Sequence, residues 1–357
     1  MSRAEATALS APSGRRALRS SPRTPFPVGM GTDSRSSVLA VGAGESLEFS
    51  ILREWSSEEV PGLGVDLRRS PEVIAKHLGV SPATVRRHLG MWRTRGFLLG
   101  YDVLPHPELL GGRLAARVLN FQDPISQEDG IDALSLIDGM IQIAPARTMV
   151  MAVYFVDSES QARRRLAQFE RIEGGAEIGP EMSFELPPCS RRMSRADWRL
   201  VLALRRNPEA RLTDLAKEVG QSTRTTSRRY DSLLEDGAVM FDPILEFSRF
   251  YETLGVLVAT VEPPGAQEQV EREIRALHPR SIHSWGPTLP DPEGRCATVF
   301  LLVSAPTAAE LDELTGRAAR VPGVTRVLLW IGRATLPVQA WLSERIEAML
   351  RSPRPST

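Results

Sequence analysis

The chain has 357 residues, of which 42% are hydrophobic, and its 44 Lys and Arg balance 44 Asp and Glu. This length allows two or more domains with cores of their own, and the zero net charge argues against a protein that coats polyanions without specificity. No apolar run approaches the roughly 18 residues of a membrane span, and the N-terminus lacks the apolar core of a secretory signal. We therefore expect a cytoplasmic protein with no membrane partner.

The two cysteines, Cys189 and Cys296, are isolated in the sequence. They lack the paired spacing of a zinc site and do not make a disulfide framework. The five histidines form no metal-ligand cluster, and no phosphate-cradling glycine loop or nucleophile elbow is present. The sequence thus predicts no metal site, no cofactor and no catalytic residue.

The first 44 residues are rich in Ser, Arg, Pro, Gly and Ala and poor in large apolar residues. Such a composition buries too little apolar surface to offset the entropy of folding. We expect residues 1–44 to be a disordered arm.

A repeat follows, in which residues 74–104 recur in altered form as residues 215–245, 141 positions later and without a gap. The two lysines of the chain form one of the identical pairs. The identities are Ala75/Ala216, Lys76/Lys217, Gly79/Gly220, Ser81/Ser222, Thr84/Thr225, Arg87/Arg228, Gly96/Gly237 and Leu104/Leu245.

Each copy has the spacing of a winged helix-turn-helix, over 45–104 and 191–245. Apolar residues predict a first helix at 45–55 and at 195–206. In the first copy, glycine and then Ser81 with Pro82 separate the second helix from the third, and Gly96 ends the third before a strand or wing over 97–103. About ten extra residues, SSEEVPGLGV, predict a loop before the second helix of the first copy.

The third helix of each copy has an apolar stripe for the core and a polar, basic face. Residues 66–96 contain seven basic and two acidic residues, and residues 191–237 contain eleven and seven. Hydroxyl and guanidinium groups at the start of such a helix suit contacts with phosphates and base edges in the major groove. The candidate contacts with double-stranded DNA are Ser81, Thr84, Arg86, Arg87, His88, Ser222, Arg224, Thr225, Ser227, Arg228 and Arg229.

After each wing, alternating and helical patterns succeed one another in the order βαββαβ, over 105–190 and 246–336. This order predicts a ferredoxin-like unit, with an antiparallel sheet covered by two helices on one face. The other face needs a cover, which the second sheet of the same chain or of another chain can provide. An amphipathic helix is expected in the tail, 337–357. The predicted fold class is α+β, with two winged helix-turn-helix units alternating with two ferredoxin-like units.

Three segments resemble the Lrp/AsnC family of transcriptional regulators, in a tandem form with two units in one chain. They are LGVSPATV, GFLLGYDVL with PELLG, and VPGVTRVLLWIG. The resemblance covers about residues 45–336. It implies a regulator that binds operator DNA, oligomerises through its ferredoxin-like units and senses a small molecule, often an amino acid. In this form one chain is expected to act as a pseudo-dimer that assembles further into homo-oligomers. The recognition-helix arginine of the family falls on Arg229 in the second copy and on His88 in the first.

The resemblance departs from the family at the hairpin between the second and third strands of the ferredoxin-like units. Amino-acid-binding members carry Gly-x-x-Asp there, whereas the first copy has APART and the second has the longer GPTLPDPEGR. The residues near these hairpins that are candidates for effector binding are Arg147, His283 and Asp291.

Two other functions stay open beside the DNA-binding regulator. Siroheme decarboxylases resemble the same family and use histidines near this hairpin, where His283 lies, but the tyrosine-arginine-histidine cluster that follows in them is missing here. We therefore expect that the chain is not an enzyme. The loop insertion and His88 favour the third alternative, an interaction protein whose first helix-turn-helix has lost DNA binding.

Overall fold

The computed structural model describes residues 46–55, 71–172, 176–179, 181–184, 186, 188–277, 282–284, 289–290 and 294–351, with the backbone alone at 282–284 and 289–290. All these residues belong to one compact unit. The expected arm, 1–44, and the expected loop insertion lie outside the described residues.

The first helical group consists of α1 (Leu47–Trp55), α2 (Pro71–Leu78) and α3 (Pro82–Arg95), followed by the strand β1 (Leu98–Pro105). Ser81 caps α3 by accepting a hydrogen bond from the backbone N–H of Thr84, 3.1 Å away. Gly96 ends α3 in the left-handed region, at φ 74°, where a side chain would be strained. The elements expected from the caps and the turn glycine are confirmed.

The second helical group has the same order: α6 (Arg195–Arg206), α7 (Leu212–Val219), α8 (Thr223–Glu235) and the strand β7 (Val239–Leu245). Ser194 and Asp197 form a capping box at the start of α6, in which each side chain bonds the backbone N–H of the other residue. Gly220 ends α7 at φ 68°. The expected helix over 195–206 is confirmed at both ends.

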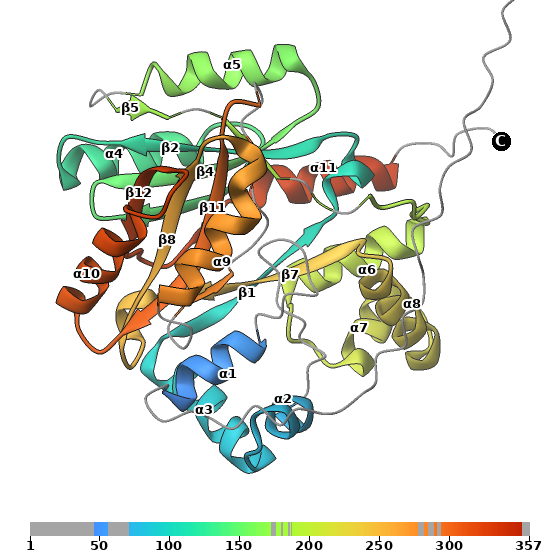
Figure 1. Cartoon of the computed structure of the whole chain (residues 1–357). Coiled ribbons are helices and arrows are strands. Elements are labelled where there is room, and N and C mark those ends of the chain that lie inside the picture. The colour runs from blue at the N-terminus through green and yellow to red at the C-terminus, as the bar shows by residue number, and fades with distance from the viewer. Residues whose placement is uncertain are drawn as a thin grey trace, which may run out of the picture. The chain divides into compact units, whose positions relative to one another are not determined.

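The strands β1 and β7 pair with each other in an antiparallel two-stranded ribbon (Figure 1). The strand that follows each helical group therefore forms its hydrogen bonds with the strand of the other group. A single cluster of buried side chains runs from α1 through this ribbon to α6. Arg93 of α3 also reaches Glu209, before α7, with 3.0 Å between its Nη1 and the carboxylate. The ribbon and these contacts join the two helical groups.

The first large sheet contains β2 (Arg113–Asn120), β3 (Met140–Ala146), β4 (Met149–Val156), β5 (Glu177–Ile178), β6 (Met182–Ser183) and β13 (Leu336–Pro337). Its order is β13-β3-β4-β2-β5, with β6 also on β2, and each pairing is antiparallel. The helices α4 (Pro124–Ser135) and α5 (Glu159–Phe169) connect its strands, and the short helix η1 (Pro107–Leu110) precedes it. This is the ferredoxin-like strand order.

The second large sheet contains β8 (Thr253–Val261), β9 (Ile282–Ser284), β10 (Leu289–Pro290), β11 (Ala297–Ala305) and β12 (Val324–Trp330). Its order is β10-β11-β8-β12, and β9 also pairs with β11. The helices are η2 (Phe247–Arg249), η3 (Pro264–Ala266), α9 (Gln267–Leu277) and α10 (Ala308–Ala318). The last helix of the chain, α11 (Gln339–Arg351), contacts α6 and is the expected amphipathic tail helix.

Successive side chains along each strand point to opposite faces of the sheet. Both faces of each large sheet are apolar. One face of the first sheet packs with Leu134 of α4 and Phe169 of α5. The helices α9 and α10 lie over one face of the second sheet (Figure 1). On that face Ile274 of α9 and Leu311 of α10 pack into the core. The remaining face of the first sheet meets the remaining face of the second. Met151 of the first sheet and Phe300 of the second lie there in one cluster. The second sheet of the same chain therefore covers the face for which the sequence required a cover.

The single last strand that the βαββαβ order predicts for the first ferredoxin-like unit is divided in the structure. The structure has two short strands, β5 and β6, both paired with β2. Pro180 stands between them in the sequence, and a proline has no N–H to donate to a ladder.

Candidate nucleic-acid interface

The starts of α3 and α8 are built in the same way. Ser222 caps α8 by accepting from the backbone N–H of Thr225 at 3.2 Å, as Ser81 does for Thr84. The serine and threonine hydroxyls are also bonded to each other, at 2.8 Å in α3 and 2.9 Å in α8. These four candidate residues hold the helix starts in shape, with both serines exposed and both threonines half-buried.

Four candidate arginines lie on the exposed faces of the same helices. Arg86 pairs with Glu72 of α2, and both side chains are more than half exposed. Arg87, Arg224 and Arg228 are exposed, and no hydrogen bond or ion pair joins them to the described residues. Exposed guanidinium groups without partners among the described residues can meet phosphates or base edges.

His88 and Arg229 point the other way, toward the first helix of their own group. His88 is 12% exposed and its Nδ1 lies 3.4 Å from Glu48 of α1, itself 9% exposed. Arg229 donates to Asp197 of α6 at 3.0 Å, and that carboxylate also meets Arg191. Burial opposes ionisation of Asp197, but hydrogen bonds from Ser194 and Arg229 hold its pKa below the usual range. In the structure both side chains are thus held by the first helix of their own group and turned away from the exposed helix face, and their contact with DNA stays a prediction.

Ser227 is half-buried and donates to Asp231 at 3.5 Å, within α8. The outward face of α8 is basic, because Arg224 and Arg228 lie on it one turn apart. The outward face of α3 has Arg87 and Arg86, of which Arg86 is paired with Glu72. Of these two helices, α8 offers the stronger attraction for a polyanion.

Of the three effector candidates, only Arg147 has a described side chain. Arg147 is exposed at the tip of the β3–β4 hairpin, where its φ of 39° makes the turn. The side chain of His283 and the whole of Asp291 lie outside the described residues, and only the backbone of His283 is placed, opposite Leu302 in β11. Effector binding by these residues therefore stays a prediction.

Sequence reasoning missed a cluster of buried polar residues on the ribbon. Asp102 of β1 and Asp242 of β7 are cross-strand partners, and both are buried. Arg205 of α6, 1% exposed, lies 3.3 Å from Asp102. Gln142 of β3 bonds to the carboxylate of Asp242. The sequence signal that could have revealed this cluster is the single acidic residue inside each apolar strand, in YDVL and in FDPIL.

Burial dominates the protonation of this cluster. It raises the pKa of Asp102, against the opposing charge of Arg205, and lowers the pKa of that arginine. Burial also raises the pKa of Asp242 well above its usual range, helped by the charge of Asp102 and opposed by the hydrogen bond from Gln142. Asp102 and Arg205 form a buried ion pair, and burial opposes the charged form of Asp242.

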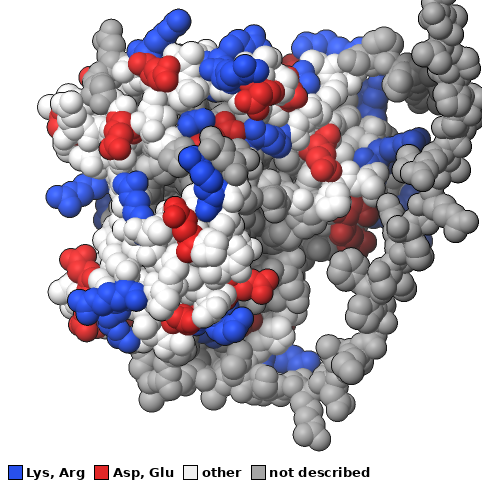
Figure 2. Space-filling view, turned by 45° about the horizontal axis from the view of Figure 1, so that its top comes forward, with Lys and Arg blue, Asp and Glu red and all other residues white. Residues whose placement is uncertain are grey.

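Charge elsewhere is mixed. Figure 2 shows one face, on which Lys and Arg side chains lie among Asp and Glu side chains. In the described ranges no three His, Cys, Asp or Glu side chains are grouped as a metal ion requires. Among the described helices, none is both long and apolar enough to cross a bilayer.

Comparison with known proteins identifies one part of the chain directly. Residues 193–240 match a family described as winged helix-turn-helix DNA-binding. This stretch contains α6, α7 and α8, with the exposed pair Arg224 and Arg228. Residues 193–240 are a winged helix-turn-helix of the DNA-binding type. No curated protein matches the chain.

Solved structures are similar at low identity. A siroheme decarboxylase, NirDL, in co-complex with an iron-uroporphyrin III analogue, has 14% identity and a TM-score of 0.45, over 85% of this chain and 99% of that one. Escherichia coli AsnC has 14% identity and a TM-score of 0.27, over 41% and 95%. The Mycobacterium tuberculosis leucine response regulatory protein has 18% identity and a TM-score of 0.28, over 38% and 91%.

The sequence-based exclusion of an enzyme is wrong. Two structures that match over 85% of the chain, one of them the complex described above, are those of an enzyme, NirDL. With identities of 13–14%, this likeness assigns no reaction to the present chain.

Proposed function

We propose that the chain is a sequence-specific DNA-binding regulator that meets double-stranded DNA with the exposed faces of α3 and α8. One observation carries the proposal: Arg224 and Arg228 project from the third helix of a winged helix-turn-helix of the DNA-binding type, without partners among the described residues. Arg87 at the corresponding place of α3 extends it to the first helical group.

We further propose that the chain arose by internal duplication and acts as a pseudo-dimer. The identical pairs of the repeat, the matching hydroxyl caps and the antiparallel β1–β7 ribbon support this. An antiparallel ribbon relates its two strands by a local two-fold axis, as in a dimer that binds two half-sites about 34 Å apart. The domain limits predicted from the sequence belong to this proposal.

The two recognition helices are expected to read different sequences, because PATVRRH in α3 and TRTTSRR in α8 present different side chains. We expect a hydroxyl-radical footprint of the protein on DNA upstream of its own gene to show two protected segments of unlike sequence. Two identical inverted half-sites bound by one chain would contradict this prediction.

Replacing Arg86 and Arg87 by alanine tests whether the first helical group touches DNA. Since Arg86 is already paired with Glu72, we expect a loss of about one unit in the slope of log affinity against log salt, from Arg87 alone. Fluorescence anisotropy at several salt concentrations measures it. An unchanged affinity and slope would favour the alternative in which this group serves protein interaction.

A further inference from the structure

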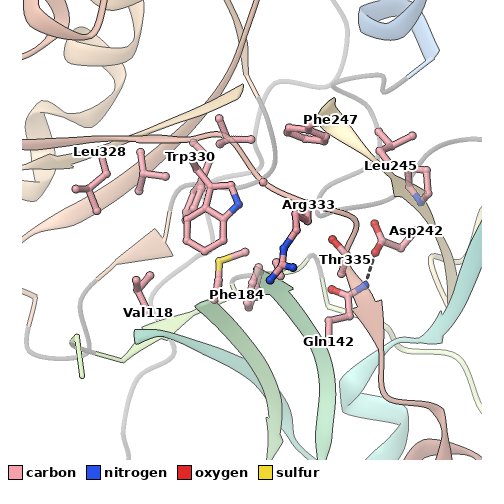
Figure 3. A pocket seen from close by; sticks show the side chains of 17 residues that line it. Val118, Gln142, Phe184, Asp242, Leu245, Phe247, Leu328, Trp330, Arg333 and Thr335 are labelled. Atoms are coloured by element: carbon pink, nitrogen blue, oxygen red, sulfur yellow. Dashed lines mark hydrogen bonds between the residues drawn. The ribbon is translucent and has the colours of Figure 1, made fainter. Parts of the chain in front are cut away.

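The helix α6 takes part in two polar clusters, one at each of its ends. At its C-terminal end, Arg205 pairs with Asp102 in the buried cluster of the ribbon. In the same cluster Gln142 bonds to Asp242 (Figure 3). The first cluster fixes α6 on the ribbon. The second cluster, at the N-terminal end around Asp197, can therefore hold other parts of the chain against α6.

The segment 188–194, which we call the strap, connects the first large sheet to α6 and contains no helix or strand. Near its start, the backbone N–H of Cys189 donates to the carboxylate of Glu108, in η1, at 2.9 Å. At its end, Ser194 and Asp197 form the capping box of α6. Because the strap is held at both ends, the side chains between these ends occupy defined positions.

Arg191, in the middle of the strap, joins the strap to α8 and to α6. Its Nη1 donates to the hydroxyl of Ser232 at 2.6 Å and pairs with Asp236, directly after α8. Its Nη2 lies 3.3 Å from Asp197, and the side chains of Arg191 and Asp197 are 13% and 4% exposed. A guanidinium group has five N–H donors in one plane, so this single side chain can tie the strap to both helices.

A second arginine reaches the same carboxylate from α8. Arg229 donates to Asp197 at 3.0 Å and to the hydroxyl of Ser194 at 3.3 Å. Asp197 is therefore shared by one guanidinium group of the strap and one of α8. Together the strap and the start of α6 hold α8 at positions 229, 232 and 236, which span about two turns of a helix.

These polar bonds matter because α8 has few apolar contacts. The fully buried side chains of α8 are Thr226 and Leu233, whereas the matching helix α3 buries Val85 and Trp92. An indole ring buries far more apolar surface than a threonine side chain. The position of α8 therefore depends more on polar bonds than the position of α3 does.

We propose that Arg191 is a positioning residue for α8, which it holds at the angle at which Arg224 and Arg228 meet DNA. This inference rests on the proposed DNA binding. The guanidinium group of Arg191 is itself taken up by α6 and α8. Hydrogen bonds to base edges need a close geometry, whereas attraction between arginines and phosphates tolerates displacement. Loosening α8 therefore reduces discrimination between sequences more than general attraction for DNA.

Amide hydrogen exchange of the full chain, followed by mass spectrometry, tests the strap without DNA. In Arg191→Met we expect residues 223–235 to exchange at least about tenfold faster, with residues 82–95 of α3 unchanged, because bonds to charged groups at α8 are lost. The matched control is Arg192→Met, since Arg192 is exposed and has no hydrogen bond or ion pair with the described residues. Exchange of α8 no faster than in this control, or equally faster in α3, would overturn the proposal.

The affinities of the same variants for DNA upstream of the gene and for random DNA test the positioning role. In Arg191→Met we expect the ratio of the two affinities to fall at least about tenfold, with the salt slope on random DNA as in the wild type. Arg192→Met is expected to keep the ratio. A slope lowered by about one would mean that Arg191 contacts a phosphate itself, and would refute the positioning role.

The two proposals fail in different ways. A wild-type chain that shows no preference for the upstream DNA would refute the proposed function, and the positioning role with it. A wild-type preference that Arg191→Met leaves intact would refute the positioning role alone, even if α8 exchanged faster in that variant.

Discussion

Replacing both Arg224 and Arg228 by alanine is expected to weaken DNA binding at least about tenfold and to lower the salt slope by about two. An arginine that contacts a base is worth about 1–3 kcal/mol, 1.4 kcal/mol is tenfold in affinity, and each phosphate contact adds about one to the slope. Both side chains are exposed on the outward face of α8, so the fold is expected to be unaffected. Anisotropy titrations at several salt concentrations measure both quantities.

A matched control is the pair Arg272→Ala and Arg320→Ala. These arginines are also exposed, but they lie in and beside the helices α9 and α10 that cover the second sheet. The control changes the net charge by the same amount and is expected to retain most of the affinity. If it weakened binding as much as Arg224→Ala with Arg228→Ala, attraction by overall charge would explain the result and α8 would not be the contact.

Replacing Arg205 by methionine is expected to lower the free energy of unfolding by about 3–5 kcal/mol, the usual cost of removing one partner of a buried ion pair. Arg205 is 1% exposed and Asp102 is 2% exposed, so the remaining carboxylate would be left without water or a counter-ion. Denaturant unfolding followed by tryptophan fluorescence measures the loss. The double variant Arg205→Met with Asp102→Asn is expected to recover most of it, since no buried charge remains. A loss without recovery would mean that Arg205 acts through packing.

A second substitution in this buried cluster is Asp242→Asn, since Asp242 lies opposite Asp102 on the same ribbon. It removes the ionisable group and keeps a polar side chain at the position. Burial raises the pKa of Asp242, so the folded state keeps a proton that the unfolded chain loses above about pH 4. Folding takes up a proton in this range, and stability therefore falls as pH rises. Asp242→Asn removes this dependence. We expect it to cost little at pH 7 and to flatten the decline of stability above pH 4.

The sequence predicted the helices well because their ends are locally encoded. Ser81 and Ser222 cap the third helices, and the glycines at 79, 96 and 220 take left-handed conformations that end helices. The period-two patterns located β2, β4, β8 and β11 for the same reason: a strand between two apolar layers shows its register in its own residues.

Contacts across the sequence were not predictable in this way. The sequence-based list of DNA contacts included His88 and Arg229, but Glu48 and Asp197, which lie at least 32 residues earlier, turn both side chains inward. Nor could spacing show that β1 pairs with β7, which brings Asp102 opposite Asp242. These buried polar residues were missed because their partners come from other elements.

The most direct test of the proposed function compares binding of the purified protein to DNA upstream of its own gene and to random DNA, at several salt concentrations. The structure presents exposed arginines for phosphates together with hydroxyls and arginines that differ between α3 and α8. We predict a preference for the upstream DNA that persists near physiological salt. Binding that ignores sequence and vanishes steeply with salt would contradict a sequence-specific regulator.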